Sequence, residues 1–435
     1  ICNQKKFYFS SCKSRKVQVD FAGGDVTSDA GALLLRQVDK KLGLTQKLSE
    51  LLEDPRRKKS CDHDQLRLLR QRIYALALGY CDINDHMTLR NDVALQTAVE
   101  ASGRLASSST LCRWENRADR EAAIRMSEWM VEVFIKSFRE PPEELVLDFD
   151  ATDDPIHGRQ EGRFFHGYYD HYCFLPLYVF CREQLLVSYL RPSNIDASKH
   201  AWAILSVLVK RFRAVWPGVR IIIRADSGFC RWRMLSWCER HEVGYIIGVA
   251  KNSRLNAMAA KLLEKARQLY ESSGEKQRLF SDIRYAANTW DKERRILVKA
   301  EHTEQGSNPR YVATNLPGEA QKLYDEIYCA RGDMENRIKE QQLDLFSDRT
   351  SCTKWWANQF RVLLSAMAYI LLQRLRDIGL KATDLAKAQC GTIRLKLLKI
   401  GAVIIRNTRR IVFHLSSAYP YQKIFITVVN RLSTA

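Results

Sequence analysis

The spacing of apolar residues predicts a mostly helical region near the start of the chain, after a short pair of strands. Basic and apolar residues alternate over roughly the first 25 positions, as in FYFS and KVQVDF, which predicts a hairpin. From about Ser28 to Glu140 the pattern is helical. Its clearest segment is DHDQLRLLRQRIYALALGY, in which Asp62 or Asp64 can cap the helix. The apolar stripe of that helix consists of Leu66, Leu68, Leu69, Ile73, Leu76 and Leu78. Residues 1–140 are therefore expected to form a mostly helical N-terminal domain.

After Pro141-Pro142 the pattern changes to apolar and β-branched runs separated by turns. LVLDFD, YCFLPLYVFC and QLLVSYL predict three strands, and a helix follows over 197–215. VRIIIRADSGF and VGYIIGVA then predict two further strands with a short helix, 231–241, between them. This order of strands and helices indicates an α/β fold, with a mixed sheet and helices on its faces.

The rest of the chain predicts a β-rich insertion, a second helical part and a basic ending. IRYAAN, RRILVKAEH and PRYVATNL predict short strands, helices follow through 326–344 and 355–376, and KIGAVIIRNTRRIVFHLSS predicts a hairpin that turns near Asn407. The predicted domains after the first are 141–271, the β-rich insertion 272–317, the helical part 318–380 and the basic segment 381–435.

Charge narrows the classes of partner. The chain carries 69 Lys and Arg against 50 Asp and Glu, a net charge of +19, which attracts polyanions such as nucleic acid. A membrane partner is not expected, because the longest apolar run, Val362–Leu372, is too short to span a bilayer. No signal peptide is visible, and because the chain does not begin with Met its natural start is expected further upstream. The 12 cysteines contain no CxxC pair, which favours reduced thiols in a cytosolic protein.

Two carboxylates are placed where strands end. Asp150 ends the first predicted strand of the sheet and Asp226 ends a later one, and active sites of such sheets gather at the carboxyl ends of strands. Two carboxylates about 4 Å apart repel by roughly 4 kcal/mol at an effective dielectric constant of about 20, so a divalent cation is the natural partner of such a pair. On the helix YCARGDMENRIKE, Tyr328, Arg331 and Glu335 share one face, and Glu335 offers a third carboxylate.

At these residues the chain resembles bacterial insertion-sequence transposases of the DDE type. LDFDATDD, RADSGF and YCARGDMENRIKE are similar to the three acid-bearing motifs of that family, in its order and spacing. The group numbered thirteen-eighty, within the set marked by a Tyr-Arg-Glu-Lys signature, is the most similar, and the resemblance extends over most of the chain. It implies an RNase H-like catalytic core with a β-rich insertion, and an N-terminal domain that binds the ends of the element.

The resemblance also assigns residues. The catalytic and metal-binding acids would be Asp150, Asp226 and Glu335, with Asp148 as the alternative for the first. The signature then assigns Tyr328 and Arg331 to DNA contact. Its Lys falls at Gln342 in this chain, and Lys339, one turn earlier, is the candidate to replace it.

The mechanism implied is phosphoryl transfer with two Mg²⁺ ions, for which Mn²⁺ can substitute. The implied partners are double-stranded DNA, as terminal inverted repeats and target, and a second copy of the chain in a synaptic homodimer, in the cytoplasm on the bacterial nucleoid. Two alternatives remain: a metal-dependent nuclease with the same core, such as a resolvase, and a non-catalytic DNA-binding protein descended from a transposase.

Other motifs are weaker. A strip without acids between Gly391 and Leu415 suits either a phosphate backbone or a solvated edge strand. Its bases are Arg394, Lys396, Lys399, Arg406, Arg409 and Arg410. Zinc sites at Cys61 and His63, or among three histidines of HGRQEGRFFHGYYDHY, are not expected. The aromatic residues of that segment, Phe164, Phe165, Tyr168 and Tyr169, can stack on an unpaired base, but we expect them in the core, as we do Trp355-Trp356.

Overall fold

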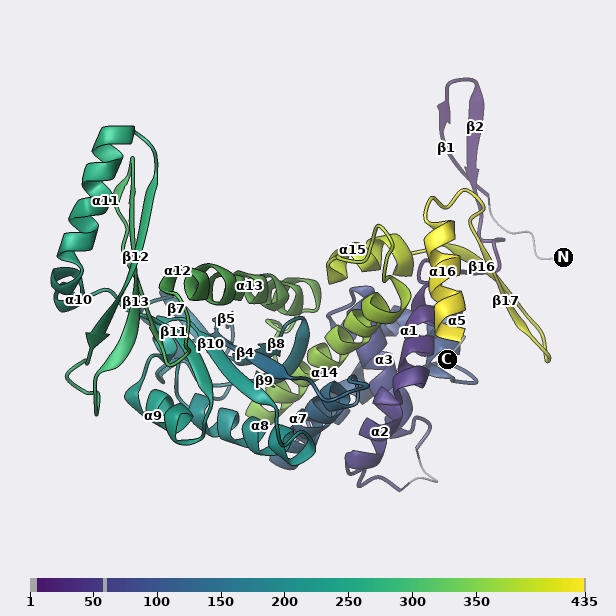
Figure 1. Ribbon diagram of the computed structural model, residues 1–435. Helices are drawn as coiled ribbons and strands as arrows, with labels where there is room; N and C mark the ends of the chain where they lie inside the picture. Colours follow the sequence, from purple (N-terminus) through teal and green to yellow (C-terminus); the bar gives the residue numbers. More distant parts are fainter. Residues whose placement is uncertain (1–5, 58–60, 434–435) are drawn as a thin grey trace. The chain divides into compact units, whose positions relative to one another are not determined.

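The computed structural model describes residues 6–57 and 61–433, and its contacts divide the chain into two compact units (Figure 1). The first unit contains residues 1–118, 344–346 and 367–435, and the second contains 119–343 and 347–366. The expected ranges 1–140 and 381–435 therefore fall largely in one unit. Among the described residues, no helix is both long and apolar enough to cross a membrane.

In the first unit, the predicted N-terminal hairpin and helical region are confirmed. Strands β1 (Phe7–Cys12) and β2 (Arg15–Val19) pair antiparallel. The helices that follow are α1 (Ala32–Leu42), α2 (Leu44–Leu51), α3 (Gln65–Leu78), η2 (Ile83–Asp85), α4 (His86–Leu89), α5 (Val93–Val99) and α6 (Ser108–Glu115). Asp64 caps α3, since its side chain accepts a hydrogen bond of 2.8 Å from the backbone N–H of Arg67.

The C-terminal hairpin is also confirmed, and it is part of a sheet that the sequence did not predict. Strand β16 (Ala402–Arg406) pairs antiparallel with β17 (Ile411–Leu415) and, on its other side, with β3 (Asp25–Thr27). Residues from the two ends of the chain thus complete one sheet. The other C-terminal elements of this unit are η7 (Leu375–Gly379), α15 (Cys390–Ile393), η8 (Arg394–Leu398) and α16 (Gln422–Ser433). Helix α14 (Trp355–Arg374) contributes residues to both units.

The second unit is built on a large mixed sheet, as expected. Its strands are β4 (Glu144–Ala151), β8 (Leu177–Cys181), β9 (Gln184–Tyr189), β10 (Arg220–Ala225), β11 (Gly244–Val249), β12 (Gln277–Tyr285), β13 (Arg294–Thr303), β14 (Gly306–Ser307) and β15 (Arg310–Thr314). They are ordered β12-β13-β15-β11-β10-β4-β8-β9, with β14 paired to β13. Strands β4, β10 and β11 are parallel, while β8 and β9 are antiparallel additions next to β4.

The β-rich insertion does not form a separate sheet. Strand β15 pairs antiparallel with β11, so the strands of 272–317 extend the main sheet at its edge (Figure 1). Before them lie two helices, α10 (Ser253–Met258) and α11 (Ala260–Ser273). The run YCFLPLYVFC also differs from its prediction as one strand. It divides at Pro176, because proline has no N–H to donate to a ladder, into β7 (His171–Phe174) and β8. Strand β7 forms a small separate sheet with β5 (Asp154–Pro155) and β6 (Phe164–His166).

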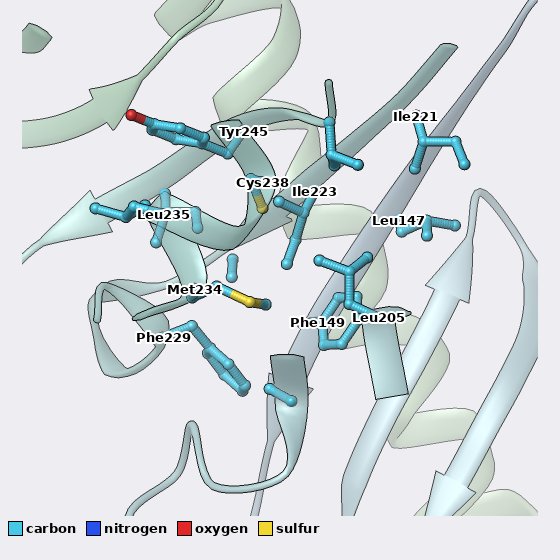
Figure 2. Packing of buried hydrophobic residues seen from close by; sticks show 14 of the residues in the cluster. Leu147, Phe149, Leu205, Ile221, Ile223, Phe229, Met234, Leu235, Cys238 and Tyr245 are labelled. Carbon is cyan, nitrogen blue, oxygen red and sulfur yellow. The ribbon is translucent and has the colours of Figure 1, made fainter. Parts of the chain in front are cut away.

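Helices cover the main sheet on both faces (Figure 1). One face packs against α7 (Arg120–Ile135), α8 (Ala201–Val215) and α9 (Trp232–Arg240). Figure 2 shows this core, in which Leu147 and Phe149 of β4 meet Leu205 of α8 and Met234 of α9. The opposite face packs against a continuous helical segment. That segment runs through α12 (Ala320–Lys322), π-helix η4 (Leu323–Tyr328), η5 (Cys329–Arg331), α13 (Gly332–Lys339) and η6 (Glu340–Asp344).

The alternation of β4 decides where its acids lie. Successive side chains of a strand point to opposite faces. Leu147 and Phe149 are fully buried in the core of Figure 2, each contributing about 1.5–3 kcal/mol by leaving water. Asp148 and Asp150 must then face the helical segment that carries Glu335.

Candidate active site

Asp150 and Asp226 lie at the same edge of the sheet, as predicted. Strands β4 and β10 are parallel neighbours, and Ala225 stands opposite Phe149 in the register. The next residue of each strand is therefore an aspartate. Asp226 begins the short helix η3 (Ser227–Phe229), and its Oδ1 accepts a hydrogen bond of 2.8 Å from the backbone N–H of Gly228. This bond fixes the Asp226 carboxylate where the strand ends.

Glu335 is joined to Asp150 through Arg331. One guanidinium nitrogen of Arg331, Nη1, lies 3.2 Å from Asp150 Oδ2, and the other, Nη2, lies 3.2 Å from Glu335 Oε1. Glu335 stands in the first turn of α13, and its side chain is 53% exposed. The three motifs of the sequence therefore meet on one face of the second unit.

The site has an excess of negative charge around Asp150. Burial raises the pKa of Asp150 to about 6, against the opposing effect of Arg331, and the charges of Asp226 and Glu335 raise it further. Its side chain is 15% exposed. The carboxylate of Asp150 is thus held in its ionised form at a cost in free energy, which a cation at this position would offset.

Tyr328 stands beside Asp226 because β11 contributes a glycine there. A Cβ at Gly248 would lie 2.6 Å from the Tyr328 hydroxyl oxygen and 3.1 Å from the Ser227 nitrogen, so a larger residue would displace the tyrosine. Burial raises the pKa of Tyr328, and the charge of Asp226 acts in the same direction. The hydroxyl therefore stays protonated and can donate a hydrogen bond at this edge.

Asp148 has a different environment from Asp150. It is 2% exposed, and Arg224 directly opposite it on β10 forms a two-pronged ion pair with it, with Nη2 donating to Oδ2 over 2.7 Å. Arg224 also donates a hydrogen bond through Nη1 to the carbonyl of Ile327 in η4. A π-helix departs from the regular α-helical hydrogen-bond pattern, and here its Ile327 carbonyl accepts from the sheet. The pair thus attaches the helix of Glu335 to the strands of Asp150 and Asp226.

The donor set suits a hard divalent cation, since carboxylate oxygens are the ligands that Mg²⁺ prefers. Within residues 6–57 and 61–433, however, no three His, Cys, Asp or Glu side chains are grouped closely enough to hold a metal ion. The Arg331 guanidinium lies between Asp150 and Glu335 and takes the position of a counter-ion. The carboxylates are therefore of the right chemical type for a magnesium site, and a bound ion would have to displace the Arg331 guanidinium from Asp150 and Glu335.

The raised pKa of Asp150 predicts a pH-dependent stability difference in the metal-free protein. A carboxyl whose folded pKa lies above its unfolded value stabilises the fold below the unfolded pKa, and that stability is lost as pH rises through about 6. In EDTA, Asp150→Asn should be more stable than the wild type at pH 7.5, by up to about 3 kcal/mol, and about equal at pH 4. Urea unfolding at both pH values measures this. An unchanged difference across the two pH values would contradict it.

Gln342 and Lys339 lie further along the same helical segment. Gln342, at the position of the signature lysine, donates a hydrogen bond of 2.9 Å to the carbonyl of Asp153. The Oδ2 of Asp153, the next acid after Asp150 in the chain, lies 2.9 Å from Nε2 of His171. Gln342 therefore holds the loop that follows Asp150. Lys339 is exposed on α13.

Most basic residues of the predicted strip contact other residues of the first unit. Arg394 donates a hydrogen bond of 2.9 Å to the carbonyl of Ala77 and approaches the position of a Cβ on Gly79, which ends α3 with a φ of 98°. Arg394 therefore closes a helix end, which differs from the free phosphate contact expected of it. Lys399 pairs with Asp29 at 2.7 Å.

The remaining bases of the strip are nearer to solvent. Lys396 lies 5.1 Å from the ring centre of Tyr421, and Arg406 pairs with Asp25 at 3.1 Å. Arg409 and Arg410 are exposed at the turn of the β16–β17 hairpin. The strip is therefore divided between basic residues that contact other side chains or the backbone and the exposed Arg409 and Arg410 at the hairpin turn.

Among the described residues, neither Cys61 and His63 nor the three histidines belong to a group of three or more possible metal ligands. Trp355 packs edge-on against Phe174, with ring centres 5.3 Å apart. The core placement expected for the aromatic segment is wrong at three positions, since Phe164, Phe165 and Tyr168 are 41%, 52% and 85% exposed.

The role of Arg224 was not predicted, although the sequence contains a signal for it. When Asp150 of LDFD and Asp226 of RAD are placed side by side on parallel strands, Asp148 falls opposite Arg224. An opposite-charge pair at matching positions is a known stabilising feature of neighbouring strands. The contact of Arg331 with the acids was missed because the signature assigns that residue to DNA.

Comparisons with known proteins place the chain in a family. A family model described as "Transposase DDE domain group 1" matches residues 9–435. A search of curated proteins found no match. Among solved structures the chain is similar to a piggyBac transposase in a synaptic complex with hairpin DNA, at 10% sequence identity and a TM-score of 0.44, over 86% of this chain and 80% of that one. The family model covers nearly the whole chain, and the chain therefore belongs to the family of transposases with a DDE domain of group 1.

Proposed function

We propose that this protein is an insertion-sequence transposase that cuts DNA at the ends of its element and joins the freed ends to target DNA. The observation that carries the proposal is the meeting of Asp150 and Asp226 at one sheet edge, with Glu335 joined to Asp150 through Arg331. Family membership supports the same reaction class. We also propose an RNase H-like core for this sheet, supported by its mixed order β9-β8-β4-β10-β11.

Asp150, Asp226 and Glu335 would hold two Mg²⁺ ions, or Mn²⁺ in their place. Bound there, the ions supply an activated attacking oxygen and a stabilised leaving oxygen. Burial raises the pKa of Asp150, and a cation bound at its carboxylate would offset that cost. Asp148 is paired with Arg224, which supports Asp150 as the first ligand. No covalent nucleophile from the protein is required.

Arg331 and Tyr328 would contact the DNA strand being cut. If cations were bound by the carboxylates, the Arg331 guanidinium could turn to a phosphate oxygen, a partner that suits its planar donors. The Tyr328 hydroxyl, protonated beside Asp226, is a second donor at the same edge. These two residues and Glu335 support membership of the set marked by the Tyr-Arg-Glu-Lys signature, within which we propose the thirteen-eighty group. The chain departs from that signature at Gln342, and we propose that the exposed Lys339 takes the role of the missing lysine.

The first unit would bind duplex DNA through its basic side chains. Arg409 and Arg410 are exposed at a hairpin turn and are the best candidates, followed by Lys396 and Lys399, while Arg394 has a structural role. Such contacts are to phosphate and give affinity that falls with salt. We further propose a homodimer that holds two element ends together, acting on the nucleoid in the cytoplasm.

The test uses the full chain and duplexes of the inverted repeats that flank its gene. With Mg²⁺ we expect nicking at the repeat end and, from a pre-nicked end, joining of the 3′-OH to a target plasmid. EDTA should abolish both reactions. Nicking without joining would favour the nuclease alternative, and binding without any Mg²⁺-dependent cut would favour the non-catalytic DNA-binding protein.

A further inference from the structure

The β6–β7 hairpin, residues 163–173, presents aromatic rings to solvent. Phe165 and Tyr172 stand directly opposite each other, with ring centres 5.7 Å apart, and are 52% and 48% exposed. The guanidinium of Arg163 lies over the Tyr172 ring, 4.9 Å from its centre. Tyr168 at the turn is 85% exposed. Clustered exposed aromatics of this kind are uncommon on a surface unless they bind something.

The hairpin is anchored beside the proposed active site. Its strand β7 begins with His171, whose Nε2 lies 2.9 Å from Asp153 Oδ2, and it pairs with β5 (Asp154–Pro155), the strand that follows Asp153. Gln342 of the Glu335 helical segment donates a hydrogen bond to the Asp153 carbonyl. The other strand of the hairpin, β6, is held through its Phe164 carbonyl, which accepts a hydrogen bond of 2.9 Å from Ser193 Oγ. Burial raises the pKa of Tyr169 to about 12, and the charges of Asp153 and Asp150 act in the same direction, which places Tyr169 near both carboxylates. The hairpin is therefore a fixed platform next to Asp150.

We propose that this aromatic hairpin stacks on unpaired bases of the DNA strand next to the phosphate that is cut. The proposal rests on the proposed function for the identity of the ligand. Aromatic rings can stack on a base only where it is not covered by its neighbours, so they select single-stranded or splayed nucleotides over intact duplex. Arg163 adds a cation beside the rings, which suits the phosphate between two such bases. Tyr168 and Phe165 are the stacking residues.

The test measures stacking without cleavage, in EDTA. The probes are a blunt 30-base-pair duplex and the same duplex with a short 3′ extension that contains 2-aminopurine. We expect wild-type protein to quench the 2-aminopurine and to bind the extended duplex more tightly than the blunt one. Tyr168→Leu with Phe165→Leu should remove the quenching and weaken binding of the extended duplex by about tenfold or more, because each base stack contributes roughly that factor. Binding of the blunt duplex should not change.

Two matched variants test whether quenching depends on the aromatic rings of the hairpin or on any exposed apolar side chain. Tyr168→Phe keeps the ring and should quench as the wild type does. Trp202→Leu removes a 48% exposed ring on α8 of the same unit and should have no effect on quenching. Leu variants that quench and bind like the wild type would overturn the proposal, and so would a change in oligomeric state without a change in DNA binding. If the protein does not cut DNA but its quenching still depends on the aromatic rings, the proposed function is wrong and the stacking proposal stands.

Discussion

Replacing Glu335 with Gln is expected to slow DNA cleavage by about a thousandfold or more while leaving DNA binding near the wild-type value. The side chain is 53% exposed and its recorded partner is Arg331, so the similar shape of Gln should leave the fold unchanged. A lost metal ligand removes several kcal/mol of transition-state stabilisation, and each 1.36 kcal/mol is a factor of ten in rate. Asp150→Asn and Asp226→Asn should behave in the same way. Nicking and gel-shift assays on the same duplex separate the two effects.

Asp333 offers a matched control for this experiment. It lies in the same first turn of α13 as Glu335 and is exposed, but it has no part in the proposed site. Asp333→Asn should therefore cut DNA at the wild-type rate. Normal nicking by one of the three variants would remove that acid from the site, and normal nicking by all three would end the enzyme proposal.

The second large effect concerns stability. Arg224→Met should lower the free energy of unfolding by about 3–5 kcal/mol, because it leaves the carboxylate of Asp148 buried without its partner. It should also slow cleavage, because Arg224 attaches the helix of Glu335 to the sheet through the carbonyl of Ile327. Urea unfolding followed by tryptophan fluorescence measures the first effect.

A double variant tests whether the buried charge is the cause. Asp148→Leu combined with Arg224→Met places two apolar side chains next to Val146 and Ile222, which already pack on that face. The double variant should recover most of the lost stability. Its cleavage should stay impaired, because the bond to Ile327 is still missing. A double variant that is less stable than Arg224→Met would show that the ion pair itself stabilises the fold.

Much of the second unit could be predicted because its signals are local. Apolar runs that end in Asp150 and Asp226 predicted two strands with an acid at the end of each, and the register of β4 with β10 shows that these strands are parallel neighbours. The pairing of β15 with β11 could not be predicted, since an edge strand can add to a sheet or form its own with the same alternating pattern. The sheet contacts of β12 and β13 depend on that choice.

The parts that failed depend on distant residues. Nothing near Arg394 in the sequence shows that it will close helix α3, more than 300 residues earlier in the chain. The exposed aromatics failed for a related reason. Ring-rich segments usually form cores, but here Tyr168 lies in the turn at Gly167–Asp170 and Phe165 lies on the exposed strand β6. The spacing of aromatic residues can indicate a hairpin, but it does not show whether another part of the protein covers that hairpin.

The sheet that joins β3 to β16 has a consequence during synthesis. Residues 25–27 leave the ribosome more than 370 residues before their partners at 402–404 are translated. The β3–β16–β17 sheet therefore cannot form until synthesis has passed residue 415, whereas all strands of the main sheet are available by residue 314. A nascent chain that terminates between these two points has every strand of the main sheet but lacks the hairpin with Arg409 and Arg410.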